Sequence, residues 1–250
     1  MIQEQLRQEN YSGLENKRVV LLGGSSGIGL AVAQQVVAQG ATAIIASSNA
    51  DRVKEAVATL DGKADGHTLD LSEEQEVQSF FQSLGDFDHL VFTAGDALQL
   101  KELAVTDLNK ARHTFELRYW AVLAAVKYAS THMREGGSII LTTGIASDRP
   151  RKGWTLAASV CGAIVSLTRA LAVELAPIRV NAVSPGVVRT NLWQNMQEHE
   201  REGMYESLGK ILLVGHVGEA CEIARAYLFL MQEGYTTGQT VVVDGGAVLV

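Results

Sequence analysis

Cysteine and proline are both scarce in this sequence of 250 residues, which contains two cysteines and three prolines. The cysteines, Cys161 and Cys221, have neither the number nor the spacing of a disulfide framework or a zinc site. The six histidines show no metal-ligand spacing, so we expect no bound metal. Residues 1–17 contain no hydrophobic run resembling a signal peptide or a membrane-spanning helix. We therefore expect a cytoplasmic protein with no membrane partner.

Positive charge is also in short supply. Lysine and arginine total 21 against 28 acidic residues, which gives a formal net charge of −7. Since no cluster of basic residues offsets this balance, we expect no nucleic-acid partner. The apolar content of 47% is enough for a substantial core and excludes a disordered chain. The length suits one large domain.

Short apolar runs alternate with helix-length segments along the chain, and these repeated units predict an α/β fold. We expect one domain over residues 1–250, built as a doubly wound parallel sheet of about seven strands with helices on both faces. The strands are expected at residues 19–22, 42–46, 66–69, 89–93, 138–142, 178–183 and 240–243. The helices are expected at residues 28–37, 49–60, 73–84, 108–132, 156–175 and 219–231.

Three further local predictions follow from the same reading. Ser72, with Gln75 three residues later, is expected to cap the helix that runs to residue 84. Residues 1–13 form an N-terminal extension to the domain. The charged and irregular stretch of residues 191–218 is expected to form a lid over the site, and the alternative is a solvated pair of helices.

A glycine-rich turn follows the first expected strand. Residues 19–22 are apolar, Gly23, Gly27 and Gly29 come next, and residues 28–37 have helical spacing. Such a turn exposes backbone N–H groups and the positive end of a helix, where a pyrophosphate can bind. The spacing G-x-x-x-G-x-G differs from the usual dinucleotide fingerprint, G-x-G-x-x-G. A glycine-rich turn without a ligand is the alternative.

Four motifs in a fixed order make the chain similar to the short-chain dehydrogenases/reductases over residues 14–246. They are GGSSGIG at residues 23–29, DLS at 70–72, IRVNAVSPGVVRT at 178–190 and GQTVVVDGG at 238–246. The resemblance implies a Rossmann-like fold, a nicotinamide dinucleotide cofactor and oxidoreductase activity on a small-molecule substrate. It also implies a homotetramer or homodimer formed through the long helices and the C-terminal segment.

The end of the second strand indicates which dinucleotide binds. An NAD-binding site usually carries an acidic residue there for the ribose 2′-hydroxyl, but this chain has Ser47 and Ser48, with Arg52 one helical turn later. Since no carboxylate repels a 2′-phosphate, we expect NADP(H) rather than NAD(H). Arg52 is either part of this contact or a surface residue beside serines that bind alone.

The resemblance also implies the other cofactor contacts. It places Asp70 and Leu71 at the adenine, Ala94 and Gly95 at the ribose, and Val188 and Thr190 at the nicotinamide and phosphate. The complete expected set is Gly23, Ser25, Ser26, Gly27, Ile28, Gly29, Ser47, Ser48, Arg52, Asp70, Leu71, Ala94, Gly95, Pro185, Gly186, Val188 and Thr190.

The four catalytic positions of the family are all changed in this sequence. Redox members use an Asn, a Ser and a Tyr-x-x-x-Lys pair, in which the tyrosine transfers the proton. The flanking motifs place Arg118, Gly144, Ala157 and Cys161 at these positions. None of the six tyrosines has a lysine four residues later. We therefore predict a degenerate catalytic tetrad, which disfavours ordinary alcohol dehydrogenase chemistry.

Arg118 is the most informative replacement, because a guanidinium facing the site needs an anionic or carbonyl partner. It either binds a substrate carboxylate or oxyanion, or pairs structurally with Glu116, Asp96 or Asp148. Asp148 is either an acid or base, or a solvated loop charge, and Thr143 offers a hydroxyl in place of the lost serine. A reactive Cys161 is the less favoured alternative to an inert one. The expected substrate-pocket residues are Trp154, Trp193 and Met196.

Three functional hypotheses remain open. The first, which we favour, is an NADP(H)-dependent oxidoreductase of non-standard mechanism, rebuilt around Arg118, Asp148 and Trp154. The second is a non-redox isomerase or cyclase on the same fold. The third is a catalytically inactive NADP(H)-binding or partner protein. Four replacements that include a gained arginine indicate rebuilding rather than decay.

Overall fold

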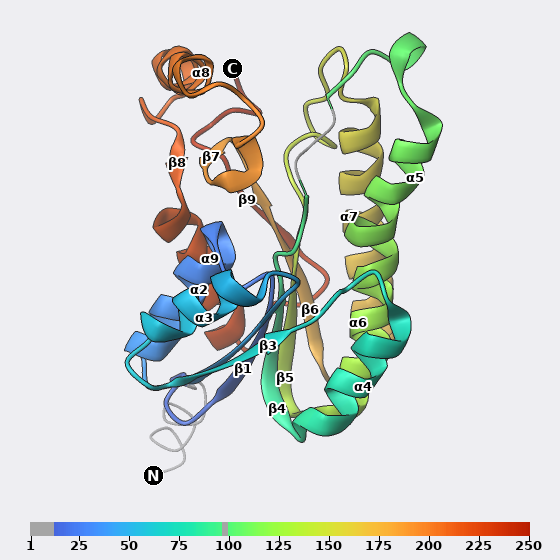
Figure 1. Cartoon of the computed structure of the whole chain (residues 1–250), viewed down its shortest axis with the longest axis vertical. Helices are drawn as coiled ribbons and strands as arrows, with labels where there is room; N and C mark the ends of the chain where they lie inside the picture. The colour runs from blue at the N-terminus through green and yellow to red at the C-terminus, as the bar shows by residue number, and fades with distance from the viewer. Residues whose placement is uncertain (1–12, 97–99) are drawn as a thin grey trace.

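The computed structural model describes residues 13–96 and 100–250, and its centre is one parallel sheet (Figure 1). Seven strands lie in the order β3-β2-β1-β4-β5-β6-β9, which confirms the predicted doubly wound sheet. The N-terminal extension expected at residues 1–13 lies, except for residue 13, outside the described residues. The strands are β1 (Arg18–Leu22), β2 (Thr42–Ser47), β3 (Ala64–Thr68), β4 (Phe87–Phe92), β5 (Met133–Thr142), β6 (Arg179–Pro185) and β9 (Thr240–Val243).

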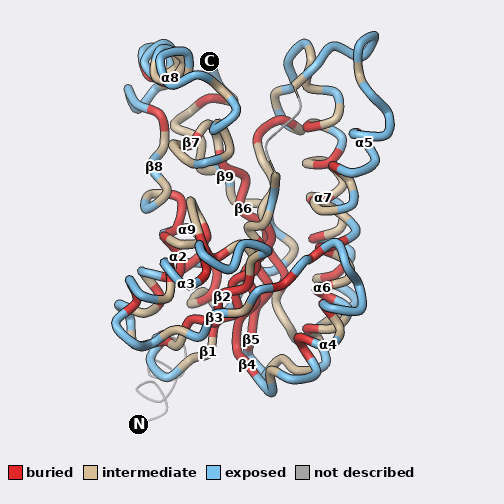
Figure 2. The backbone as a smooth tube through the Cα atoms, in the orientation of Figure 1, coloured by how far each residue is buried: buried red, intermediate tan, exposed pale blue. Residues whose placement is uncertain are grey.

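Helices cover both faces of this sheet (Figure 1). One layer contains α2 (Gly27–Ala38), α3 (Ala50–Ala58) and α9 (Ala220–Gln232). The other contains α4 (Glu74–Leu84), α5 (Leu108–Phe115), α6 (Ala121–Ala129) and α7 (Thr155–Glu174). The apolar cores of the two layers meet at the central strands, which are buried on both sides (Figure 2). This double burial explains why those strands are almost continuously apolar in the sequence.

Residues 186–219 form a smaller unit beyond the carboxyl end of β6. Strand β7 (Val188–Arg189) pairs in parallel with β8 (Gly218–Glu219). Between these strands lie a short 3₁₀ turn, Asn191–Trp193, and helix α8 (Glu198–Ile211). Helix α8 is the element expected to form the lid, and most of its length is exposed (Figure 2).

One local prediction was wrong. Ser72 does not cap helix α4: Glu73 occupies the N-cap position without a side-chain capping hydrogen bond, and the Ser72 hydroxyl and amide both donate to Asp70 Oδ1, at 2.7 and 2.9 Å. The helix predicted over residues 108–132 is confirmed in its bounds, but it changes type along its length. A π-helical turn, Glu116–Trp120, joins α5 to α6 and contains Arg118. Such turns break the regular spacing of side chains and are frequent at functional sites.

Helix α7 is long and apolar enough, by length and composition alone, to cross a membrane. Its residues Val160, Ile164 and Leu171 are buried in the domain, and the helix packs against β6. Packing against the sheet therefore explains why this side of α7 is apolar. The outer side also carries apolar residues, including Val173, which is 82% exposed.

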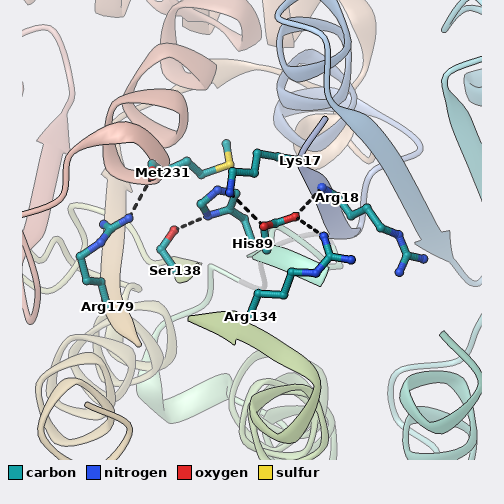
Figure 3. A network of polar contacts seen from close by, with 8 residues as sticks. Lys17, Arg18, His89, Arg134, Ser138, Arg179 and Met231 are labelled. Carbon is teal, nitrogen blue, oxygen red and sulfur yellow. Dashed lines mark hydrogen bonds and ion pairs between the residues drawn. The ribbon is translucent and has the colours of Figure 1, made fainter. Parts of the chain in front are cut away.

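A buried polar network crosses the amino ends of the central strands (Figure 3). His89 on β4 shares a hydrogen bond of 2.9 Å with the Ser138 hydroxyl on β5. The neighbouring Asp88 carboxylate accepts hydrogen bonds from Lys17 Nζ, the Arg18 backbone N–H and Arg134 Nη1. Ligands of such sheets bind beyond the carboxyl ends of the strands. This network, which the sequence analysis did not identify, therefore belongs to the framework of the fold.

Candidate functional site

The glycine turn lies at the carboxyl end of β1, next to the point where the strand order reverses between β1 and β4. Gly23 has φ +89°, and a Cβ there would lie 2.5 Å from the backbone nitrogen of Ala94. A Cβ on Gly29 would collide with the Gly23 carbonyl oxygen. A Cβ on Gly27 would touch Thr190 at 3.4 Å. The glycines therefore allow the turn at residues 23–29 to pack closely against Ala94 and Thr190, which are far from it in the sequence.

The beginning of α2 has the properties of an anion site. Ser26 occupies the N-cap position but makes no side-chain capping hydrogen bond, and the first turn contains no acidic residue. Ser25 beside it is buried, and Ile28 is half-buried. The first N–H groups of a helix carry partial positive charge and need acceptors from outside the helix. The turn thus fits the pyrophosphate of a dinucleotide.

The end of β2 presents small polar groups without a carboxylate. Ser47 is half-buried, Ser48 is exposed, and Asn49 caps α3 by accepting a hydrogen bond of 2.9 Å from the Arg52 backbone N–H. The Arg52 side chain is exposed. The structure thus identifies a capping role for Asn49 and leaves both readings of Arg52 open.

Asp70 and Leu71 follow β3 and lie near this edge of the sheet. Leu71 is buried in the core, whereas Asp70 is exposed. The hydrogen bonds from the Ser72 hydroxyl and amide hold the pKa of Asp70 below its ordinary value. Asp70 is therefore an ionised acceptor with a fixed orientation at neutral pH.

Thr93 joins the end of β4 to the glycine turn. Its hydroxyl lies within hydrogen-bond distance of the carbonyl oxygens of Leu22 and Gly23, at 3.2 and 3.3 Å. Ala94 and Gly95, the residues expected at the ribose, follow directly. The contact fixes the backbone of this segment beside the expected phosphate position.

Arg118 extends from the π-helical turn to this same segment. Its Nε lies 3.3 Å from Asp96 Oδ1, and its Nη2 donates to the Asp96 backbone carbonyl. A Cβ on Gly95 would lie 2.8–2.9 Å from the guanidinium atoms, so the group packs closely on that glycine. Asp96 is one of the three structural partners expected for Arg118. The side chain is only 20% exposed.

Arg118 also lines a small cavity, of about 40 Å³, between the carboxyl ends of β4 and β5 and helices α6 and α7. Thr143 and Cys161 line it too, and a Cβ on Gly144 would lie 3.4 Å from Cys161 Sγ. The Thr143 hydroxyl donates to the Cys161 backbone carbonyl at 2.9 Å. Burial raises the pKa of the Cys161 thiol. Such a thiol stays protonated at neutral pH, as expected for an inert cysteine.

The remaining expected catalytic and pocket residues lie outside this cavity. Asp148 is exposed beside Ser147, and Trp154 stands at the N-cap of α7 with the Arg151 guanidinium 5.5 Å from its ring centre. Trp193 Nε1 donates to the Val188 carbonyl at 3.1 Å, and Met196 is half-buried before α8. Ala157 is buried in α7, one turn before Cys161.

Pro185 ends β6, and Gly186 begins the segment that leads to α8. A Cβ on Gly186 would lie 2.9 Å from the Cα of Asp244, so close packing on the C-terminal segment requires a glycine. Val188 is buried, and Thr190 lies on the glycine turn. Of the three partners named for Arg118 from the sequence, the structure selects Asp96. One contributor was not identified from the sequence: Arg189, whose Nη1 lies 2.7 Å from Glu202 Oε2 on α8. Sequence spacing carries no signal for that contact.

Three comparisons with known proteins agree with this geometry. The family profile described as enoyl-(acyl carrier protein) reductase matches residues 23–248. The mouse 3-oxoacyl-[acyl-carrier-protein] reductase is 34% identical, and the match covers 92% of this chain and 98% of the mouse protein. The MalC reductase/Diels-Alderase from Malbranchea aurantiaca superimposes with a TM-score of 0.88 at 31% identity, covering 95% of this chain and 98% of MalC.

A second solved structure is of a small-chain dehydrogenase in complex with NADPH. It superimposes with a TM-score of 0.85 at 36% identity, and the match covers 94% of this chain and all of that chain. Profile, sequence and structure each extend over nearly the whole domain. The chain belongs to the short-chain dehydrogenase/reductase family.

Proposed function

We propose that this protein binds NADP(H) and catalyses a reaction of a small molecule at an active site rebuilt around Arg118. The observation that carries the proposal is the position of the guanidinium. It packs on Gly95 in a cavity at the carboxyl edge of the sheet, whereas Gly144, Ala157 and Cys161 offer no proton relay. In this reading the degenerate tetrad marks a changed mechanism within an oxidoreductase family.

Two features of the structure and one comparison support NADP(H) as the cofactor. The uncapped start of α2 and its glycine turn fit a pyrophosphate. Ser47 and Ser48 place hydroxyls rather than a carboxylate at the end of β2. A relative of 36% identity is in complex with NADPH. When bound, the cofactor supplies the hydride chemistry. Substrate binding, positioning and proton exchange are left to residues of the chain.

Arg118 would bind a carbonyl or carboxylate oxygen of the substrate. Asp96 holds the guanidinium on one side, and a planar group fixed in this way is a directional donor to an oxygen that gains negative charge. The Thr143 hydroxyl donates its proton to the Cys161 carbonyl, so we propose that Thr143 positions the site rather than protonates the substrate. Asp148, which is exposed, is the candidate for exchanging a proton with solvent.

Substitution at the end of β2 tests the cofactor preference. We expect wild-type protein to bind NADPH at least about tenfold more tightly than NADH, and Ser47→Asp to remove that difference by repelling the 2′-phosphate. Isothermal titration calorimetry measures both affinities. Arg52→Ala separates the two readings of Arg52, since weaker NADPH binding would show a direct contact. Absence of NADPH binding by the wild-type protein would contradict the proposed function.

Arg118→Ala tests the rebuilt site. We expect NADPH binding to remain within a few-fold and turnover of a carbonyl substrate, found by screening NADPH consumption, to fall about 10²–10³-fold, as on loss of an oxyanion donor. Arg118→Lys should not restore turnover, because one ammonium cannot bind Asp96 and the substrate with the geometry of a guanidinium. Full turnover by Arg118→Ala would assign Arg118 a structural role.

A cyclase is the second candidate, and one comparison favours it. The structure of 31% identity is described as a reductase/Diels-Alderase, so this fold supports ring formation in that protein. On this reading Arg118 would orient a polar substrate, and product would form without consumption of NADPH. Product analysis with and without the cofactor, alongside the absorbance of NADPH, separates the two candidates.

We also propose that the protein assembles as a homotetramer or homodimer. The outer side of α7 carries exposed apolar residues such as Val173, and Trp120, at the end of the π-helical turn that contacts α7, is 53% exposed. Burying such surface against a second copy removes it from water. Light scattering should give a mass of two or four chains, and a monomer at micromolar concentration would contradict this proposal.

A further inference from the structure

Arg118 is the one charged group among the described residues that line the cavity at the carboxyl ends of β4 and β5. Apolar side chains of α6 and α7, such as Val122, Val160 and Ile164, form much of the remaining wall. The Arg118 side chain is only 20% exposed. Because little water reaches it, its charge is weakly screened and acts on any other charge that enters the cavity.

The described residues of the cavity wall do not cancel this positive charge. The Asp96 carboxylate, 3.3 Å from Arg118 Nε, is not part of the wall, so the guanidinium presents its charge to the cavity. Asp96 is also 33% exposed, and water screens it more than it screens Arg118. Cys161 does line the cavity, but burial raises the pKa of its thiol, which stays uncharged at neutral pH. Asp148 is exposed to water and lies outside the wall.

The guanidinium lies beside the segment expected to hold the dinucleotide. Its atoms are 2.8–2.9 Å from the position of a Cβ on Gly95, one of the residues expected at the ribose. The preceding residue, Ala94, packs on the glycine turn that fits the pyrophosphate. In the proposed reaction, the nicotinamide ring comes to about 3–3.5 Å from the carbon whose oxygen Arg118 binds. The ring and the guanidinium are then separated by a single carbonyl group.

The two redox forms of the cofactor differ in charge only at this ring. The nicotinamide of NADP⁺ carries a positive charge, whereas the dihydronicotinamide of NADPH is neutral, and the phosphates are the same in both. A cation beside the ring therefore repels the oxidised form and leaves the reduced form unaffected. Since the phosphate and adenine contacts are common to both forms, the ratio of the two affinities isolates the effect at the ring.

We propose that Arg118 makes the dinucleotide site selective for NADPH over NADP⁺. The inference rests on the proposed function, and it adds that the site responds to the redox state of the cofactor. We expect NADPH to bind about tenfold more tightly than NADP⁺, the repulsion between two unit charges about 10 Å apart at an effective dielectric constant of about 20. A tenfold ratio corresponds to about 30 mV in the potential of the bound two-electron couple. In a mixture of the two forms, the protein is therefore filled preferentially by NADPH.

Isothermal titration calorimetry with NADPH and with NADP⁺ measures the ratio directly, without any substrate. Arg118→Met removes the charge but keeps an extended side chain. It should lower the ratio about tenfold, through tighter binding of NADP⁺, while the affinity for NADPH changes only a few-fold. Arg118→Lys keeps a positive charge and should keep most of the preference. These two variants separate the effect of the charge from the effect of the shape of arginine.

Asp96→Asn tests the sign of the effect. It removes the carboxylate opposite the guanidinium while keeping an amide of similar shape, so the positive charge of Arg118 should act more strongly and the ratio should rise about threefold. A merely structural role would move Arg118→Met and Asp96→Asn in the same direction. The matched control, Lys110→Met, removes an exposed cation from α5 and should leave the ratio unchanged.

The outcomes separate this inference from the proposed function. If the wild type binds NADP⁺ as tightly as NADPH, or if Arg118→Met keeps the wild-type ratio, the selectivity of Arg118 is wrong and the cofactor site stands. If the wild type binds no NADPH, the proposed function is wrong and the selectivity is wrong with it. Circular dichroism and the unfolding midpoint of each variant establish that the domain is folded.

Discussion

Gly29→Ala is expected to abolish measurable NADPH binding and to lower the free energy of unfolding by about 3 kcal/mol, the upper range for overpacking. The added Cβ would collide with the Gly23 carbonyl oxygen and lie 2.5 Å from Thr93 Oγ1. Gly23 has no room to move toward Ala94, because even a Cβ built on it would lie 2.5 Å from the Ala94 backbone nitrogen. Helix α2 would have to separate from β1, which would displace the N–H groups at the beginning of the helix.

Urea unfolding and calorimetric titration measure the two parts of this prediction. Gly203→Ala is the matched control, because a Cβ on Gly203 in α8 meets nothing within 4 Å. That substitution should stabilise the protein by up to about 1 kcal/mol through helix propensity. If Gly29→Ala unfolds and binds NADPH like the wild type, the turn is not the close-packed cradle described above.

Acid is expected to destabilise the protein by about 3 kcal/mol between pH 6.5 and pH 4 through His89 alone, at about 1.4 kcal/mol for each unit of pKa shift. Burial, reinforced by the nearby Arg179 and Lys17, lowers the pKa of His89 from 6.5 to about 4, although Asp88 opposes the shift. Between pH 6.5 and pH 4, His89 is therefore protonated in the unfolded chain but remains neutral in the folded chain. The stabilisation is complete above pH 6.5 and is lost as the pH falls toward 4.

The neighbouring Asp88 acts in a different window. Burial raises its pKa, but the Arg18 hydrogen bond, with the charges of Lys17 and Arg134, outweighs this and keeps the pKa below its ordinary value of 3.8. A carboxylate with a lowered pKa contributes stability that is lost only as the pH falls below that value. Of the two neighbouring groups, His89 therefore accounts for the loss between pH 6.5 and pH 4, and Asp88 acts only at lower pH.

His89→Asn tests this assignment, because asparagine does not titrate and can still form a hydrogen bond with Ser138. Urea unfolding at several pH values should show a flatter dependence in this variant than in the wild type. His199→Asn, on the exposed α8, is the control and should keep the wild-type dependence. A wild-type slope in His89→Asn would place the acid sensitivity elsewhere in the molecule.

The regular parts of the fold were predictable because their signals are local. Every strand except the edge strand β3 contains a short apolar run, each helix repeats at its own spacing, and the glycine turn is contiguous in the sequence. The sheet, its helices on both faces and a phosphate-sized turn at its carboxyl edge follow from these patterns. Local signals failed where a side chain had two partners to choose from. Ser72 is a good capping residue, yet it turns back to Asp70.

The site itself depends on distances that a sequence does not contain. By itself, the sequence determined the α/β architecture, the glycine turn and the absence of any Tyr-x-x-x-Lys pair. Only the tertiary structure decided that Arg118 pairs with Asp96, that Thr143 donates to Cys161, and that Arg189 meets Glu202. The last contact also spans two elements, β7 and α8, whose separation in space is set by the rest of the fold. Spacing along the chain predicts elements, whereas the partner of a long polar side chain is selected by which groups the packed elements bring within its reach.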